Sequence, residues 1–397
     1  MSPLAVLAAT ATTACGSGLA ALRQSLQSFR SGLRPNDFGA APLPTHIGRV
    51  AGLEDSPLPA SLSGWECRNN RLAWLALQQD GLLPALHLAL ARFGAERVAL
   101  VVGTSTSSIG ASEEAYRRLG PDGQFPADLK RPIVHTPHSL GDFLQQATGI
   151  RGPAVTVATA CSSSAKVFAQ AARMIQAGLV DAALVGGVDS LCDSVLYGFN
   201  SLGLVSQQPC RPFDRHRDGL SLGEAGGYAL LQRTESDQHP GAWLLGYGES
   251  SDAHHMSSPH PEGLGAKLCM QAALDRAGLP AEAVDYLNLH GTATPKNDEI
   301  EAAAVASLFP PRTRASSTKG FTGHTLGAAG IVESVIALSA IDTGLMPGTI
   351  NCSDPDPACS EHLLRQNQQA EVRVVMNNSF GFGGNNCSLL FGAGARS

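Results

Sequence analysis

Short apolar runs alternate with longer Ala- and Leu-rich stretches along most of this chain, and this alternation limits its fold more than any other feature. Apolar runs without polar interruption are typical of strands buried on both faces of a sheet. The stretches 162–177 and 326–343 are followed by Gly178 and Gly344, and glycine directly after a periodic segment commonly ends a helix. The alternation therefore predicts an α/β fold. The expected strands are 97–102 (RVALVV), 154–157 (AVTV), 182–185 (AALV), 286–289 (YLNL) and 372–376 (VRVVM).

Two segments about half a chain apart have the same build. Residues 155–168 (VTVATACSSSAKVF) and 374–390 (VVMNNSFGFGGNNCSLL) each indicate a strand, a tight turn of small residues and then a new element. This similarity favours two related lobes. The polar, Pro- and Gly-containing stretch 236–241 (SDQHPG) suits a boundary between them. We therefore expect an N-terminal half, 1–238, and a C-terminal half, 239–397.

Composition argues against several other classes of protein. Apolar residues make up 43% of the 397 residues and charged residues only 16%, which fits a large core and an extensive contact with a partner subunit. The net charge of −6 gives none of the basic excess that nucleic-acid binders show. Nine cysteines without a CxxC pair indicate reduced thiols in a cytoplasmic protein. The N-terminal apolar run has no preceding basic residue, so it predicts a first buried strand rather than an export signal. No apolar stretch is long enough to predict a membrane span.

Cys161 is the first candidate catalytic residue. It lies in TVATACSSSAK (156–166), where an expected buried strand runs into small residues and then a helix. Unpaired N–H groups and the positive end of a helix dipole favour thiolate, so this position predicts a lowered thiol pKa. The small neighbours leave room for a substrate beside the sulfur. For the other cysteines, a buried structural role is the better interpretation.

Two histidines and a lysine lie on similar turns. His290 follows an expected strand in LNLHGTATPKNDEIE (287–301), and SSTKGFTGHTLGAAG (316–330) places Lys319 in a loop and His324 before a helix rich in small residues. A lone histidine is more often a satisfied core residue than a catalyst. Two histidines on glycine-flanked turns, together with Cys161, suit thioester chemistry, because a thiolate accepts an acyl group and neutral imidazoles donate hydrogen bonds to an enolate oxygen.

These segments together resemble the elongating β-ketoacyl-acyl carrier protein synthases of the thiolase superfamily. The resemblance extends over nearly the whole chain, with the motifs in the family's order and spacing. It rests on ACSSS (160–164), PFDRHRDGLSLGEAGG (212–227), DAHHMSSPHPEG (252–263), HGTAT (290–294), TKGFTGHTLGAAG (318–330) and NSFGFGG (378–384). It implies a thiolase-type five-layered αβαβα fold made of two similar halves, usually dimeric.

The resemblance also implies a role for each matching residue. Cys161 would accept the acyl group, and His290 and His324 would assist decarboxylation of a malonyl extender. Lys319 would be the active-site lysine, held by Glu301. The backbone N–H groups of Cys161 and Phe382 would form the oxyanion hole, with the Phe382 side chain also acting as a gate. Four further residues would bind substrate, Thr292 and Thr294 at the pantetheine arm and Phe380 and His255 along the channel, and Asn288 would support the site.

The same resemblance implies which partners and cofactors to expect. Phosphopantetheine would arrive on an acyl carrier protein, so no metal or redox cofactor is expected. The loop that holds His254, His255, Met256 and His260 suits no metal site, since no carboxylate or cysteine spacing supports one. Basic residues at 68, 71, 130 and 131 are candidates for docking the carrier. The partner subunit would be a second copy or a chain-length-factor-like protein.

Several positions depart from the family pattern without removing a catalytic group. Ala293 replaces glycine or serine, GEAGG (223–227) differs from GEGAG, Lys166 stands where histidine is frequent, and Asn385 replaces threonine. These departures indicate a specialised branch. ACSSSAKVF (160–168) and CRNNRLAW (67–74) resemble synthases of aryl polyene pigment clusters, so fatty acid, polyketide and aryl polyene synthesis are all candidate pathways.

Three other functions compete with condensation. A non-catalytic chain-length factor typically lacks the nucleophilic cysteine, whereas this chain has Cys161 and both histidines. A thiolase uses a second C-terminal cysteine as acid and base, but NSFGFGG occupies that place and Cys387 lies outside the turn. An initiating synthase pairs cysteine with histidine and asparagine. Here Lys319 within TKGFTGHTLGAAG (318–330) favours the elongating class instead.

Overall fold

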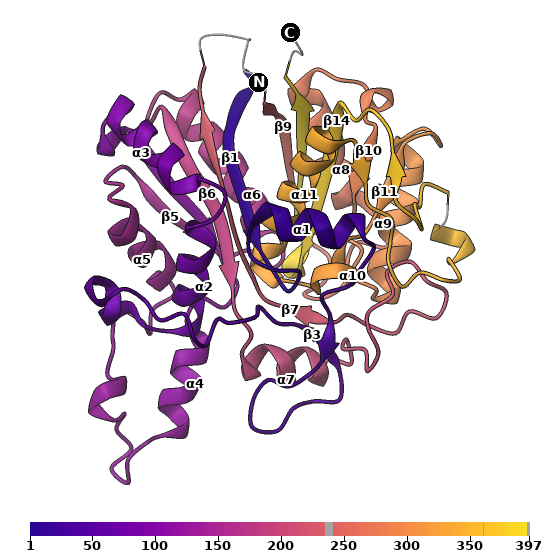
Figure 1. Ribbon diagram of the computed structural model, residues 1–397. Coiled ribbons are helices and arrows are strands. Elements are labelled where there is room, and N and C mark those ends of the chain that lie inside the picture. The colour runs from indigo at the N-terminus through magenta and orange to yellow at the C-terminus, as the bar shows by residue number, and fades with distance from the viewer. Residues whose placement is uncertain (235–240, 360, 395–397) are drawn as a thin grey trace.

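The computed structural model describes residues 1–234, 241–359 and 361–394. Ten strands form one sheet that consists of two groups of five (Figure 1). The N-terminal group comprises β1 (Leu4–Thr12), β4 (Val98–Gly103), β5 (Ala154–Val157), β6 (Ala182–Asp189) and β8 (Ala225–Gln232). The C-terminal group comprises β9 (Ala242–Ser251), β10 (Tyr286–Asn288), β11 (Arg314–Ser316), β14 (Val374–Gly381) and β15 (Asn385–Ala393).

The two groups have the same topology. Their orders are β1-β8-β6-β4-β5 and β9-β15-β14-β10-β11, so each half places its first strand beside its fifth, then its fourth, second and third. Strand polarity also matches, because the first three strands of each order are antiparallel and the last three are parallel. The prediction of two similar halves is confirmed, but the segments 155–168 and 374–390 that suggested it are not equivalent, because β5 is the third strand of its half and β14 is the fourth. They join where Leu4 and Ala5 of β1 pair with Leu244 and Trp243 of β9. The predicted boundary between residues 238 and 239 lies outside the described residues.

Helices cover both faces of each half and make five layers, as the resemblance implied. Helices α2, α3 and α5 cover the outer face of the N-terminal half, α6 and α11 lie between the halves, and α8 and α9 cover the outer face of the C-terminal half (Figure 1). Their bounds are α2 (Arg68–Leu77), α3 (Leu82–Phe93), α5 (Ser139–Thr148), α6 (Ser163–Gln176), α8 (Leu264–Ala277), α9 (Pro295–Leu308) and α11 (Ala329–Thr343).

Strand β4 shows how the layers are built. Val98, Leu100 and Val102 belong to the outer core against α2, α3 and α5, whereas Ala99 and Val101 belong to the central core with α6 and α11. Successive residues of a strand point to opposite faces, so a continuous apolar run serves two cores at once. A third apolar core lies beneath α8 and α9.

The central helices approach each other closely. A Cβ atom at Gly330 of α11 would lie 2.4 Å from the backbone nitrogen of Ala165 on α6, so only glycine fits there. The small residues at the start of this helix therefore allow close packing. The segment Leu326–Thr343 is long and apolar enough to cross a membrane, but 83% of it is buried inside the protein, as in a core helix.

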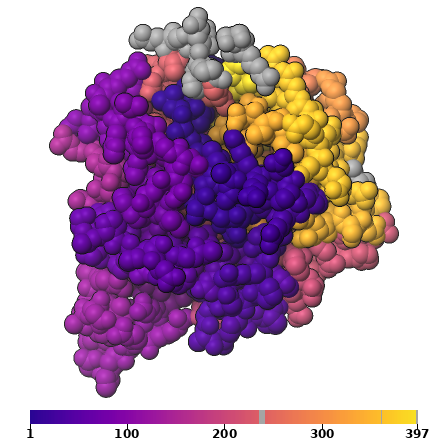
Figure 2. All heavy atoms as spheres, in the orientation of Figure 1, coloured from indigo at the N-terminus to yellow at the C-terminus, as the bar shows by residue number. Residues whose placement is uncertain are grey.

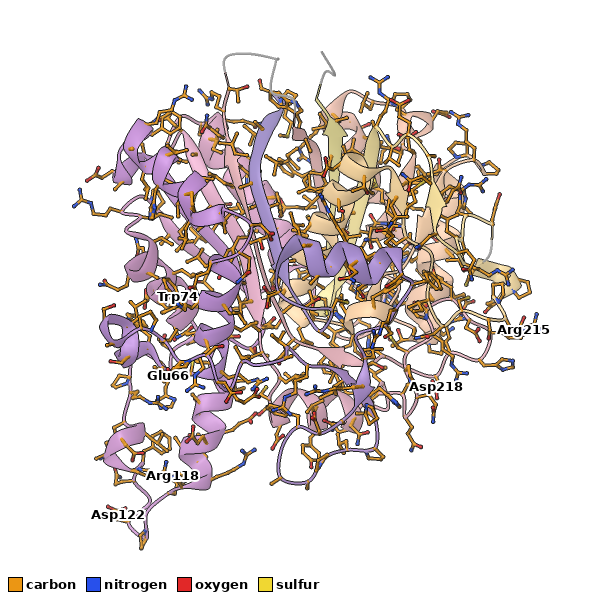
Figure 3. The ribbon with its side chains drawn as sticks, viewed as in Figure 1. Glu66, Trp74, Arg118, Asp122, Arg215 and Asp218 are labelled. Atoms are coloured by element: carbon orange, nitrogen blue, oxygen red, sulfur yellow. The ribbon has the colours of Figure 1, made fainter. Side chains whose placement is uncertain are left out.

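Strand β5 differs from the prediction of a strand buried on both faces. Ala154 is exposed and Val155–Val157 are only half-buried. The reason is its place at the end of the strand order, where it has β4 as its one neighbour. Beside it, the segment that contains α4 (Ile109–Arg117) projects from the body (Figures 2 and 3), with Arg118 and Asp122 near its tip.

Candidate active site

Cys161 lies on the turn between β5 and α6, as predicted. The turn is strained, since Ala160 has a φ of 53° although it is not glycine. Ser163 stabilises it: the Ser163 hydroxyl accepts a hydrogen bond from the Thr159 N–H at 2.9 Å and donates one to the Ala160 carbonyl at 2.6 Å. The strain therefore presents the Cys161 thiol immediately before the first turn of α6.

His324 contacts the sulfur directly. Its Nε2 lies 3.1 Å from Cys161 Sγ, and its Nδ1 accepts a hydrogen bond from the Leu326 N–H at 3.3 Å. A neutral imidazole whose Nδ1 accepts must carry its proton on Nε2. His324 therefore donates to the sulfur.

His290 completes a compact group of three. The centroid of its ring lies 5.4 Å from that of His324, and the two rings are nearly perpendicular. The Cys161 sulfur and one ring nitrogen of each histidine all lie within 4.8 Å of one another. The Lys319 ammonium donates to the His290 carbonyl and lies 3.4 Å from His290 Nδ1. Because an ammonium has no lone pair, Nδ1 accepts and Nε2 carries the proton. Two imidazole N–H donors thus meet beside one thiol.

The predicted pairing of Lys319 with Glu301 is wrong. The Lys319 ammonium forms a buried ion pair with Glu333 on α11, and both residues are almost inaccessible to solvent. Glu301 on α9 instead accepts hydrogen bonds from the His290 and Gly291 N–H groups, both at 2.8 Å. Its carboxylate therefore supports the turn that carries His290, and burial raises the pKa of Glu301 to about 7.

The prediction of a lowered pKa at Cys161 is also wrong. Burial raises the pKa of the Cys161 thiol to about 12, although the Lys319 charge and the Phe382 N–H oppose this effect. Removing water from the sulfur disfavours the thiolate, and this effect outweighs the stabilisation that the Lys319 charge and the Phe382 N–H provide. Cys161 therefore rests as a thiol, and its ionisation depends on charges and donors that line the cavity.

Both histidines are neutral for the same reason. Burial lowers the pKa of His290 well below its usual value, and the charge of Lys319 lowers it further. Burial followed by the Lys319 charge likewise lowers the pKa of His324. At neutral pH the site consequently holds two imidazole donors, with the positive charge placed on the lysine.

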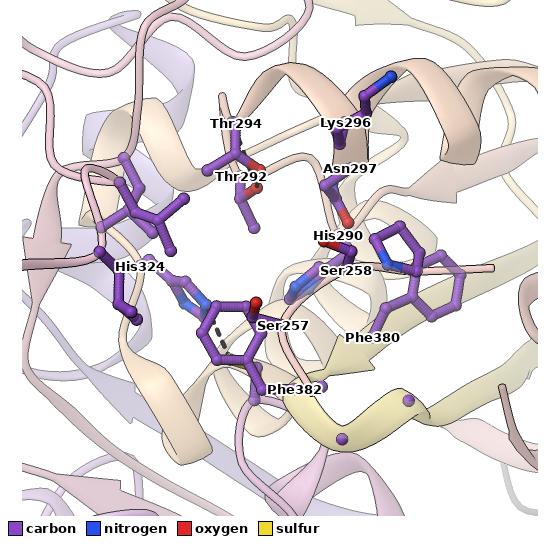
Figure 4. Close-up of a pocket in the computed structure, with 18 of the residues that line it drawn as sticks. Ser257, Ser258, His290, Thr292, Thr294, Lys296, Asn297, His324, Phe380 and Phe382 are labelled. Atoms are coloured by element: carbon purple, nitrogen blue, oxygen red, sulfur yellow. Dashed lines mark hydrogen bonds between the residues drawn. The ribbon is translucent and has the colours of Figure 1, made fainter. Parts of the chain in front are cut away.

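The group opens into a cavity of about 380 Å³. His290, His324, Phe380 and Phe382 line this cavity together with Thr292, Thr294, Lys296, Asn297, Ser257 and Ser258 (Figure 4). The hydroxyls of Thr292 and Thr294 lie 2.8 Å apart. The volume suits a small-molecule ligand or substrate arm that reaches the sulfur through this cavity.

The position of Phe382 is compatible with both of its predicted roles, oxyanion donor and gate, which stay predictions. Its backbone N–H points at the Cys161 sulfur, and its ring stacks on Phe199 of α7 (Asp193–Ser201) with centroids 5.7 Å apart. The ring lies in the lining of the cavity beside His324 (Figure 4).

Two other predicted residues lie away from the cavity lining. Asn288 is buried behind it and donates to the Thr318 hydroxyl at 3.3 Å, which supports the turn before Lys319. His255 is exposed, and its loop lines the cavity through Asp252, Ser257, Ser258 and Pro259 instead. The expectation that His255 lines the channel is not supported in this conformation. The rings of His254 and His260 are tilted by 60° to each other, with centroids 5.3 Å apart.

Sequence analysis missed Glu333, Asp189 and Phe199. Glu333 had a usable signal, because it is the one acidic residue within the apolar segment AGIVESVIALSAI (329–341) and a buried charge requires a partner. Asp189 had a weaker one, as an acidic residue that ends the apolar run AALVGGVD (182–189). Phe199 had none, since its position over Phe382 depends on how two distant segments meet.

A thiol between two neutral imidazoles, at the end of a narrow cavity, defines a class of enzyme that condenses acyl thioesters. Comparison with known proteins agrees. The family model described as the N-terminal domain of β-ketoacyl synthase matches residues 69–237, and the C-terminal domain model matches residues 241–353. The chain belongs to the β-ketoacyl synthase family.

Individual relatives support this assignment. The 3-oxoacyl-[acyl-carrier-protein] synthase 2 of Coxiella burnetii is 31% identical over 94% of this chain and 94% of its own length. The mitochondrial 3-oxoacyl-[acyl-carrier-protein] synthase of Arabidopsis thaliana is 41% identical over 61% of this chain and 57% of its own. Among solved structures, the ketosynthase ApeO in complex with its chain length factor ApeC, from Xenorhabdus doucetiae, aligns over 98% of both chains with a TM-score of 0.89 and 37% identity.

Proposed function

We propose that this protein is an elongating 3-oxoacyl-acyl carrier protein synthase, which condenses an acyl thioester with malonyl carrier protein and releases carbon dioxide. The observation that carries this proposal is the 3.1 Å contact between Cys161 Sγ and His324 Nε2, with neutral His290 in the same cavity. Phosphopantetheine belongs to the carrier and enters as part of the substrate, and the condensation itself balances without a metal or a redox cofactor.

The first half-reaction transfers the acyl group to Cys161. The sulfur attacks the carbonyl carbon of the carrier thioester, the bond from that carbon to the pantetheine sulfur breaks, and the Cys161 proton leaves with the released pantetheine thiol. The N–H groups of Cys161 and Phe382 stabilise the oxyanion of the tetrahedral intermediate. Because burial disfavours a free thiolate at Cys161, proton loss accompanies the attack rather than preceding it.

The second half-reaction forms the carbon–carbon bond. Malonyl carrier protein loses carbon dioxide, and the electrons of the broken bond form an enolate whose oxygen accepts hydrogen bonds from Nε2 of His290 and His324. The enolate carbon attacks the acyl carbon on Cys161. Collapse of this intermediate breaks the bond to the sulfur, restores Cys161 and releases the β-ketoacyl carrier protein.

The arrangement of the cavity supports this use. Thr292 and Thr294 place two hydroxyls along the approach to the sulfur, where they can bind the amides of a pantetheine arm. Lys296 lies at the same cavity and is 76% exposed, which places a positive charge where an acidic carrier would dock. Arg68 and Arg71 are weaker docking candidates than their sequence indicated, because they already pair with Glu54, Glu224 and Glu66.

The partner subunit is proposed on two observations. The exposed edge of β5 and the projecting α4 segment, with Tyr116 65% and Ile133 45% exposed, form a surface suited to a second subunit. ApeO binds a chain length factor. We infer that this chain is the catalytic half of a comparable heterodimer, with a homodimer as the alternative. The resemblance to aryl polyene synthases favours a polyene product, and we place the protein in the cytoplasm.

Intact-mass spectrometry tests the activity. Protein mixed with acyl carrier protein thioesters should gain one acyl group, and Cys161→Ala should gain none. The set of accepted acyl groups would then narrow the pathway. Failure of the wild type to load any donor, alone and with a candidate chain-length-factor subunit, under conditions that load a known synthase, would overturn the proposal in favour of a non-catalytic subunit.

A further inference from the structure

Asp189 is a buried carboxylate outside the proposed catalytic group. It is the last residue of β6 and is 0% exposed. Its oxygens accept hydrogen bonds from the Thr104 hydroxyl at 2.6 Å, the Ser105 N–H at 2.9 Å, the Thr106 N–H at 2.9 Å, the Thr106 hydroxyl at 2.7 Å and the Gly327 N–H at 2.6 Å. Burial raises the pKa of Asp189, and these donors oppose that effect by stabilising the ionised carboxylate.

These donors come from both halves of the molecule. Thr104–Thr106 follow β4 of the N-terminal half, whereas Gly327 belongs to the 3-10 turn Leu326–Ala328 that begins α11 in the C-terminal half. The fit is tight, because a Cβ atom at Gly327 would lie 2.6 Å from Asp189 Oδ2 and 2.7 Å from the Ser105 nitrogen. Hydrogen bonds to Asp189 thus link the two halves at the N-terminus of α11.

The Gly327 turn also orients His324. The Leu326 N–H, next to Gly327, donates to His324 Nδ1, and this bond places the imidazole proton on Nε2 toward Cys161. Leu326 has a φ of 55°, which is strained for a side chain of its kind and persists only where neighbours hold it. The Gly327 N–H that donates to Asp189 belongs to the residue directly after this strained leucine.

Asp189 also acts on the sulfur through its charge. The other titratable groups around Cys161 are Lys319 on α10 (Lys319–Thr322), Glu333 on α11, and the neutral His290 and His324. Of the charged ones, Lys319 favours thiolate, while Asp189 and Glu333 disfavour it. Glu333 is paired with Lys319, whereas the partners of Asp189 described above are neutral dipoles. The charge of Asp189 also disfavours the thiolate form of Cys192, whose pKa is raised first of all by burial.

We propose that Asp189 is a positioning residue of the condensation site, which fixes the turn that orients His324 and whose carboxylate opposes reaction of the Cys161 thiol. The proposal rests on the proposed roles of Cys161 and His324. Its test uses alkylation of Cys161, which needs no turnover, so its failure can be told apart from failure of the proposed function.

The experiment measures two rates in each full-length variant. The first is the rate of iodoacetamide labelling of Cys161 at fixed pH, followed by mass spectrometry of its peptide with Cys161→Ser as the blank. The second is the condensation rate. In Asp189→Asn the charge is lost and one N–H of the cluster loses its acceptor. Labelling should become about three- to tenfold faster, since a nearby negative charge no longer opposes thiolate. Condensation should become at least about tenfold slower, because His324 loses its fixed geometry.

Two further variants separate charge from loosening of the fold. Glu224→Gln changes another fully buried carboxylate, which accepts from the Val50 and Leu191 N–H groups and forms an ion pair with Arg68, and it should leave labelling within about twofold of wild type. Thr106→Val keeps the Asp189 charge but removes one hydroxyl dipole that offsets it, so labelling should become about twofold slower. If these substitutions acted only by loosening the fold, labelling of Cys161 would become faster in Thr106→Val as well.

The outcomes are distinct. Faster labelling with slower condensation in Asp189→Asn, together with slower labelling in Thr106→Val, supports the proposal. Unchanged labelling in Asp189→Asn, or equal acceleration in Asp189→Asn and Glu224→Gln, overturns it. If Asp189→Asn does not fold, the direction of the Thr106→Val change decides.

Discussion

Lys166 of α6 donates a hydrogen bond to Asn385 at the start of β15, with Nζ 3.4 Å from Oδ1. Lys166 follows the nucleophile turn, and Asn385 follows the turn that carries Phe382. Both residues depart from the family pattern noted in the sequence, and the structure brings them together. The two departures are therefore one feature, which ties the nucleophile helix to the oxyanion turn.

This pairing predicts that substitutions at the two positions are coupled. Lys166→His and Asn385→Thr should each lower the free energy of unfolding, and the double variant should lower it by less than their sum. The coupling should be about 0.3–1 kcal/mol, because the contact is long and partly exposed. Urea denaturation of the four proteins measures it. Strict additivity would show that the contact contributes nothing.

The Lys319–Glu333 pair predicts a stronger coupling. Glu333→Gln leaves a buried ammonium without its counter-charge and should cost about 3–5 kcal/mol of stability. Glu301→Gln should cost about 1–3 kcal/mol, because one backbone N–H loses its acceptor.

Double-mutant cycles with Lys319→Met distinguish the two carboxylates. The Lys319–Glu333 cycle should show large coupling, and the Lys319–Glu301 cycle should be nearly additive. A larger coupling in the Lys319–Glu301 cycle would instead support the Lys319–Glu301 pair that the sequence resemblance implied.

The lowered histidine pKa values predict how activity responds to pH. His290 and His324 are neutral in the folded protein well below pH 6.5, so decarboxylation of malonyl carrier protein should show no histidine titration between about pH 6 and pH 8. Stability should respond differently. Both side chains gain a proton more readily when unfolded, so stability is fully present above about pH 6.5 and falls as pH drops below it.

Paired profiles of activity and denaturation midpoint check both signs, with His290→Gln as the reference. An activity limb near pH 6.5 that disappears in this variant would contradict neutral histidines.

The oxyanion turn predicts a steric effect at Gly381. A Cβ atom there would lie 2.7 Å from the Thr159 carbonyl oxygen and 3.1 Å from Ser162 Oγ, although the φ of −104° suits any residue. Gly381→Ala should therefore push the Phe382 N–H away from Cys161 and slow acylation about 10²–10³-fold, as loss of an oxyanion donor does.

Gly198→Ala is the matched control for this substitution. Gly198 also has no positive φ, and no atom lies within 4 Å of a Cβ atom placed there. Acylation should stay near the wild-type rate, and helix α7 should gain stability. Stopped-flow loading with an acyl carrier thioester compares the two, and equal rates would contradict a close fit at Gly381.

Local sequence was sufficient to predict which residues gather at the site. Cys161, His290 and Lys319 each follow a strand and precede glycine or other small residues, so their placement near strand ends follows from short segments alone. His324 instead follows the short helix α10 and precedes the turn that begins α11, as its place before a helix predicted. The strand at 154–157 was predicted with the bounds that β5 has. The turn between β14 and Asn385 was also predicted to follow a strand.

Partner choice and ionisation could not be predicted in the same way. Whether Lys319 meets Glu301 or Glu333 depends on the rotation and depth of α9 and α11 in the packed molecule. The pKa of Cys161 is set by complete exclusion of water, which local spacing does not report, so the visible helix dipole led to the wrong sign. The exposure of β5 likewise depends on its position in the strand order.

The identical strand order of the two halves has a consequence for how the site arose. The parallel strands β4, β5 and β6 lead to Thr104, Cys161 and Asp189, and their counterparts β10, β11 and β14 lead to His290, Lys319 and Phe382. An ancestor with two equal halves would have offered the same three strand ends twice. In this chain one copy carries the nucleophile and the other carries the proton donors, the lysine and the oxyanion turn. The site therefore needs both halves, because neither half alone carries the nucleophile, the imidazole donors and the oxyanion turn.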